Sequence, residues 1–189
     1  MTAKSLPSRK IHPQKFALYI AMASIAMMFA GLTSAYIVRK SQGNWRAYEM
    51  PQAFWYSTVV ILLSSVTIAL GLQAFKQRKM PRYRLLITVT LILGILFGIL
   101  QYLGFYELYH LPQPVRVEGN PSESFLFIIA GLHLAHIAGG VVALLIVFFR
   151  AFRVRTKEYS STGLEIVANY WHFVDLLWIY LFIFFLANQ

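Results

Sequence analysis

The feature that most limits how this chain can fold is a series of apolar blocks, each long enough to cross a lipid bilayer. Five such blocks are separated by charged or polar segments, at residues 16–38, 54–75, 85–106, 125–149 and 166–186. A helix needs about 20 apolar residues to cross a hydrocarbon core of about 30 Å. Backbone groups in lipid must be hydrogen-bonded within a helix or a closed barrel, and these blocks are too long and too uniformly apolar for barrel strands. The sequence therefore predicts an all-α fold, a single membrane domain of five transmembrane helices over residues 1–189.

The positive charges predict how the helices are oriented. A net charge of +10 could indicate a nucleic-acid binder, but the Lys and Arg residues lie at the ends of the apolar blocks, where they act as topology signals. Thirteen of the 17 lie in the N-terminal tail and in the second and fourth connecting segments, which share one side if there are five spans. The positive-inside rule then places the N-terminus in the cytoplasm and the C-terminus outside, with no nucleic-acid partner.

Polar residues inside the last block are the first candidates for a site. At 100° per residue, Glu165, Asn169, His172 and Asp175 form one stripe on a helix, with Asp175 about 15 Å deeper than Glu165. A charged side chain near the bilayer centre costs about 3 kcal/mol, so such residues are usually kept for a partner or a function. The chain has no cysteine, which excludes disulfides, thiolate metal sites and iron–sulfur clusters.

Histidines in the fourth block add to this set. His133 and His136 are three residues apart and therefore share a helix face. Together with His172 they could ligate a metal or haem, or they could relay protons with the carboxylates. Buried polar groups need hydrogen-bond partners more often than metals, so we favour a structural cluster without metal, in which imidazoles bond Asp175, Glu165 or a backbone carbonyl. Trp171 and Trp178, beside the stripe, are expected to pack.

Small residues at four-residue spacing occur in three blocks, where they let helix backbones approach closely. We expect them to pack within the chain. They are Ala26, Ala30 and Ser34; Gly94 and Gly98; and Gly131, Ala135 and Gly139.

The segment "GLEIVANYWHFVDLLWIYLF", residues 163–182, resembles the signature of the last helix of cytochrome c oxidase subunit III, G-x-E-x-x-x-x-Y-W-H-F-V-D-x-x-W. The segment "GLHLAHIAGG" is similar to that family's G-x-H-x-x-H-x-x-x-G on the preceding helix. The resemblance runs through the whole chain, which looks like the short five-helix form. The matching residues are Gly163, Glu165, Tyr170, Trp171, His172, Phe173, Val174, Asp175 and Trp178, with Gly131, His133, His136 and Gly140.

The resemblance implies a subunit of a proton-pumping haem–copper oxidase of the aerobic respiratory chain, in a bacterial inner membrane. Haem and copper would belong to oxidase subunits I and II, and this chain would hold no redox centre, cofactor or catalytic residue. It would pack beside the catalytic subunit, bind phospholipid and support proton uptake, with a larger respiratory supercomplex as a further partner. Asp175 and His172 would then serve assembly more than chemistry.

The basic cytoplasmic edge is expected to hold anionic lipid headgroups. The residues we expect to bind lipid are Arg78, Arg82, Arg84, Arg150 and Arg153.

The chain also departs from the family pattern at two acids. Ile25 stands where the first helix of the family carries a buried carboxylate, and Gln101 is followed by Tyr102 and not by the second acid. A proton-collecting role that depends on those two acids is therefore not carried over to this chain.

Three alternatives remain. Subunit III of a quinol oxidase has a similar five-helix form, and nothing in the chain identifies the electron donor. An accessory subunit of a nitric-oxide reductase is a second alternative. A small bis-histidine haem protein, which would use His133, His136 and His172 directly, is the third.

Overall fold

The computed structural model of this chain describes residues 13–43, 50–110, 121–153 and 161–188. These residues form five helices and no strand, and each helix is long and apolar enough to cross a membrane. The predicted all-α architecture of five spans is therefore confirmed. The helices are α1 (Pro13–Lys40), α2 (Gln52–Lys76), α3 (Met80–Tyr109), α4 (Pro121–Phe152) and α5 (Ser161–Ala187).

Every helix extends past the apolar block that predicted it. Helix α3 begins at Met80, with a proline in its first turn, whereas its apolar block begins at residue 85. A proline fits there because the first backbone N–H groups of a helix have no intrahelical partner. The turn before it is tight: Arg78 has φ 57°, and Lys79 N donates to Ala74 O at 3.0 Å. This turn makes α2 and α3 an antiparallel pair.

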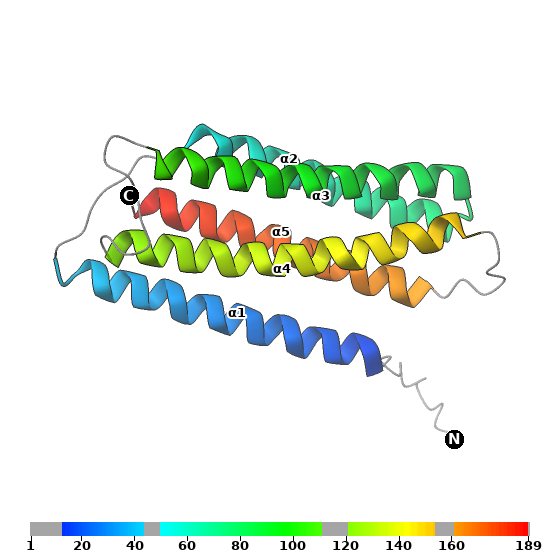
Figure 1. Ribbon diagram of the computed structural model, residues 1–189. Helices are drawn as coiled ribbons and strands as arrows, with labels where there is room; N and C mark the ends of the chain where they lie inside the picture. Colours follow the sequence, from blue (N-terminus) through cyan, green and yellow to red (C-terminus); the bar gives the residue numbers. More distant parts are fainter. Residues whose placement is uncertain (1–12, 44–49, 111–120, 154–160, 189) are drawn as a thin grey trace, which may run out of the picture.

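The helices lie in three layers, with α5 in the middle one (Figure 1). The α2–α3 pair forms one outer layer, α4 and α5 form the centre, and α1 forms the other outer layer. Helix α5 contacts α1, α2 and α4, whereas α1 contacts only α4 and α5 among the described helices. Helix α5, which carries the polar stripe, therefore contacts three other helices, as α4 does.

Large apolar side chains are found both inside the bundle and on its surface. Trp171 and Trp178 are almost fully buried, as expected, whereas Met27, Leu85 and Leu176 are more than 60% exposed. An exposed apolar surface is stable in lipid, since acyl chains are as apolar as leucine. Burial in this protein therefore depends on helix neighbours and not on hydropathy.

The expectation that all three small-residue stripes pack within the chain is wrong for two of them, and in the third it holds at Gly94 but not at Gly98, which has nothing within 4 Å. A Cβ added at Gly94 would lie 2.8 Å from Trp171 Cη2, so this glycine makes room for the indole. By contrast, Ala26, Ala30 and Ser34 are exposed, and so are Gly131, Ala135 and Gly139. Spacing of four places residues on one face of a helix but does not say which way the face points.

Trp171 instead finds its second small partner at Gly140, where an added Cβ would lie 2.9 Å from Cζ3. One indole therefore fills the space between α3 and α4, and this space requires two glycines.

Candidate functional site

The ring nitrogens of α5 are bonded to hydroxyl groups of α2. These contacts join two helices that are adjacent in space and about a hundred residues apart in sequence. Inside a bilayer such bonds are valuable because water cannot replace them. The pairs are His172 Nδ1 with Ser65 Oγ at 2.6 Å, Trp171 Nε1 donating to Ser64 Oγ at 3.0 Å, and Trp178 Nε1 donating to Thr58 Oγ1 at 3.0 Å.

Hydroxyl groups of α2 also bond α3. Gln101, which is 2% exposed, donates from Nε2 to Ser57 Oγ at 2.8 Å, and the hydroxyls of Thr67 and Thr90 lie 2.8 Å apart. Helix α2 therefore carries a series of hydroxyl groups along the membrane-spanning part of the bundle. Some of them form hydrogen bonds with α3, and the others form hydrogen bonds with α5. This series was not among the predicted site residues, although the segment "LLSSVTIA" shows part of it in an otherwise apolar block.

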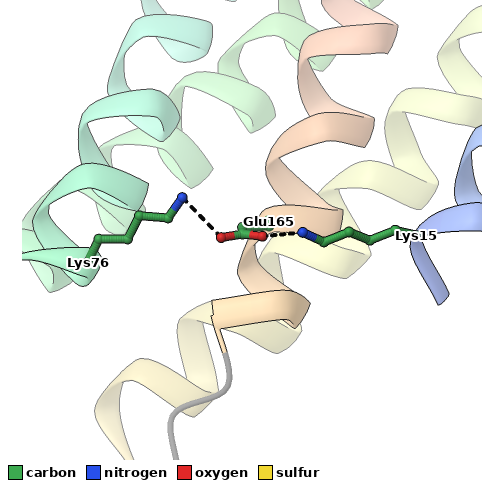
Figure 2. Close-up of polar contacts among 3 residues, drawn as sticks. All are labelled: Lys15, Lys76 and Glu165. Atoms are coloured by element: carbon green, nitrogen blue, oxygen red, sulfur yellow. Dashed lines mark hydrogen bonds and ion pairs between the residues drawn. The ribbon is translucent and has the colours of Figure 1, made fainter. Parts of the chain in front are cut away.

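Glu165 lies in the N-terminal part of α5, between lysines from two other helices (Figure 2). Its Oε2 pairs with Lys15 of α1, and its Oε1 lies 3.0 Å from Lys76 Nζ of α2. Of the three acceptors that the sequence left open for an imidazole, Glu165 is therefore not the one used, because lysines occupy both of its oxygens. Two cations reach the carboxylate from opposite sides because α1 and α2 flank α5 at this end.

Asp175 is 2% exposed, and neither of its carboxylate oxygens has a hydrogen-bond partner among the described residues. Ser65 is close enough to interact with it, but no contact reaches hydrogen-bond geometry. The expected pairing of Asp175 with His172 is therefore wrong, because the His172 ring lies against the Ser65 hydroxyl of α2. A polar stripe on one helix does not determine which neighbouring group completes each bond.

The two histidines of α4 have different surroundings. His136 Nδ1 lies 2.7 Å from Leu132 O, as expected for an imidazole bonded to a backbone carbonyl. His133 is 1% exposed, and neither of its ring nitrogens has a partner in the described part of the chain. Its ring stacks on Trp178 at 5.4 Å and meets the ring of Phe29 edge-on at 6.3 Å. The predicted cluster is thus divided into separate contacts.

No group of three or more His, Cys, Asp or Glu side chains within residues 13–43, 50–110, 121–153 and 161–188 is placed to hold a metal ion.

The arginines expected to bind lipid also fall into different environments. Arg84 Nε donates to Ala151 O at 2.9 Å, and its guanidinium lies 5.6 Å from the centre of the Phe152 ring. Arg150 lines two adjoining cavities of about 180 and 540 Å³, and Arg153 lines the larger one.

Arg78 and Arg82 are exposed near the α2–α3 turn. The other positive charges used to orient the chain lie partly outside the described residues, among them Arg9, Arg46, Arg116 and Arg155.

These features define a class: a helical membrane protein with several spans, whose intramembrane polar side chains mainly join its own helices. A family model described as cytochrome c oxidase subunit III matches residues 46–187. The chain is 31% identical over 166 residues to cytochrome c oxidase subunit 3 of Corynebacterium diphtheriae, covering 83% of this chain and 79% of the relative. A probable subunit 3 of Nocardia farcinica is 30% identical over 168 residues, covering 86% of this chain and 82% of the relative.

A probable subunit 3 of Rickettsia bellii is 35% identical over 150 residues, with 76% of this chain and 52% of the relative covered. The chain belongs to the cytochrome c oxidase subunit III family. Membership implies a complex with other oxidase subunits.

Proposed function

We propose that this chain is a non-catalytic subunit that stabilises the catalytic part of a proton-pumping oxidase, retains phospholipid and supports proton uptake during sustained turnover. The observation that carries the proposal is that the signature residues of α5 form hydrogen bonds within the bundle. Trp171, His172 and Trp178 all bond hydroxyls of α2, so the most characteristic residues of the family build the interior of the bundle. Haem and copper would be held by subunits I and II, with cytochrome c as the electron donor.

Phospholipid retention is supported by the charge at the cytoplasmic end. Glu165 is the only acidic residue described there, and it is already paired with Lys15 and Lys76. Arg150 and Arg153 have no acidic partner among the described residues, and they lie beside cavities with mainly apolar walls. Each Lys or Arg near the surface attracts anionic lipid by about 1 kcal/mol. A phospholipid with its headgroup at these arginines and an acyl chain along α4 would fit both the positive charges and the apolar walls.

Localisation in a bacterial inner membrane, with the N-terminus in the cytoplasm and the C-terminus in the periplasm, is part of the same proposal. Helix α1 begins and α5 ends at opposite ends of the bundle, which supports termini on opposite sides (Figure 1). The quinol-oxidase alternative differs only in the electron donor and needs a substrate assay.

The haem-protein alternative is less well supported, since His136 bonds its own helix and aromatic rings enclose His133. An absorption spectrum of the chain without its partners would test it directly.

The proposal is tested by purifying the oxidase with and without this chain and following oxygen consumption over time. We expect the initial rate to be largely kept, activity to decline over sustained turnover, and bound phospholipid to fall when the chain is absent. An immediate severe loss of turnover with unchanged lipid would overturn the proposal.

Paired arginine variants test the lipid contribution within the intact complex. Arg150→Gln with Arg153→Gln should lower bound anionic phospholipid. Arg78→Gln with Arg82→Gln, which removes the same charge away from the cavities, should lower it less. Equal losses from both pairs would mean that the basic edge attracts lipid only through its overall charge.

A further inference from the structure

Helix α1 is held very differently at its two ends. Its buried residues are Phe29, Thr33 and Tyr36, all in the half that leads toward the outer side. None of its hydrophobic residues before Ile25 belongs to the core or packs against it. Figure 1 shows the same difference, because α1 diverges from α4 toward its N-terminal end. Apolar packing therefore fixes only the outer half of this helix.

Polar contacts strengthen that outer half. Thr33 Oγ1 lies 2.8 Å from the Tyr180 hydroxyl in α5. Near the end of α5, Asn188 O accepts hydrogen bonds from the Tyr36 hydroxyl at 3.2 Å and from Lys40 Nζ at 2.9 Å. This part of α1 has a packed side, one bond to α5 and two bonds to Asn188 directly after it, so it can act as a fixed pivot.

The cytoplasmic half has one polar tie to the described part of the chain, the ion pair of Lys15 with Glu165. Glu165 divides its two oxygens between Lys15 and Lys76 and so connects α1 with α2, which do not contact each other directly (Figure 2). The pair is partly exposed, with 28% of the Lys15 side chain and 18% of the Glu165 side chain accessible. Ion pairs that reach solvent are weak and are screened by salt.

We propose that Glu165 is a latch, which holds the cytoplasmic half of α1 against the bundle and, when released, lets that half swing about the segment Phe29–Tyr36. From Lys15 to Phe29 the helix is about 21 Å long, so a swing of about 15° moves its end by about 5 Å. Release would open the seam between α1 and the α4–α5 layer to lipid from the cytoplasmic leaflet. The latch is a property of this chain's conformation and does not depend on the proposed function.

The test measures the separation of α1 and α4 in the assembled oxidase by double electron–electron resonance. Spin labels are attached through p-acetylphenylalanine at Phe16 and Ile146, both exposed, so that cysteines of partner subunits do not interfere. A second pair at Ile37 and Ile128, also exposed, reports the outer half. We expect Glu165→Gln to lengthen or broaden the Phe16–Ile146 distances by several ångström and to leave the Ile37–Ile128 distances unchanged.

Matched variants separate the two arms of the latch. Lys15→Gln should have the same effect as Glu165→Gln, while Lys76→Gln, which leaves the α1 arm in place, should have a smaller one. If a variant fails to assemble, the unaltered chain in 1 M salt supplies the measurement, since the screening length falls to about 3 Å. Unchanged Phe16–Ile146 distances on breaking the pair, or equal changes at both label pairs, would overturn the latch.

Discussion

The Nδ1 atom of His172 lies 2.6 Å from the hydroxyl of Ser65, so the family's signature histidine is bonded to α2 and not to the aspartate one turn further along its own helix. This bond is one of three that join ring nitrogens of α5 to hydroxyls of α2 in the described part of the chain. In a bilayer, where burial of apolar surface adds little between helices, such bonds and close packing supply much of the specificity.

Removing the hydroxyl of Ser65 should weaken the attachment of α5 to α2. We expect Ser65→Ala to destabilise the chain by about 1 kcal/mol, because the imidazole of His172 loses its partner where water cannot replace it. The measurement is the temperature at which half of this chain dissociates from the purified oxidase. Ser24→Ala is the control, since its exposed hydroxyl bonds only Ile20 O of its own turn. Equal behaviour of the two variants would show that the His172 bond contributes nothing.

Glycines beside the Trp171 indole should not tolerate a methyl group. Gly94→Ala is expected to destabilise the chain by about 1 to 3 kcal/mol, because the new Cβ would lie 2.8 Å from Trp171 Cη2. Gly98→Ala, one turn away on the same helix with nothing within 4 Å, should be neutral or slightly stabilising. The readout is again thermal dissociation.

The same comparison can be made on α4. Gly140→Ala would approach Trp171 Cζ3 to 2.9 Å, whereas Gly139→Ala meets open space. If alanine at Gly94 and Gly140 were tolerated as well as alanine at Gly98 and Gly139, the close packing of Trp171 would not explain the need for glycine.

Asp175 should be replaceable without loss of assembly when its volume is kept. Its carboxylate has no hydrogen-bond partner among the described residues, so burying it as a charge is costly and uncompensated. We expect Asp175→Asn to leave the amount of this chain in the complex at or above the normal level, with the initial rate of oxygen consumption unchanged. Asp175→Ala, which also leaves a cavity, should be less stable. A loss of assembly in Asp175→Asn would show that the carboxylate itself has a structural partner.

Membrane orientation can be measured directly because the chain has no cysteine of its own. Gln42 follows α1 and Gln77 follows α2, and both are exposed. We expect an impermeant maleimide to label Gln42→Cys in intact spheroplasts and Gln77→Cys only after permeabilisation. The reverse pattern would place the N-terminus outside.

The number of helices and their approximate positions followed from the sequence alone. Lipid thickness sets a minimum length for an apolar helix, and this is a local property that can be counted along the chain. The same holds for the stripe from Glu165 to Asp175, since residues three and four apart share a face of any α-helix. The buried positions of Trp171 and Trp178 were also expected, and both are almost fully buried.

Only the tertiary structure decided what each of those faces meets. Helical periodicity gives the angles between residues on one helix, but not the rotation of that helix relative to its neighbours. In a soluble protein the hydropathy pattern predicts this rotation, because the apolar face of each helix turns to the inside and the polar face turns to water. In lipid both sides accept apolar residues, so the stripes Ala26–Ala30–Ser34 and Gly131–Ala135–Gly139 could face outward while Gly94 and Gly140 pack against Trp171. For the same reason the partners of His172 and Glu165, Ser65 on α2 and Lys15 and Lys76 on two helices, became evident only once the helices were packed.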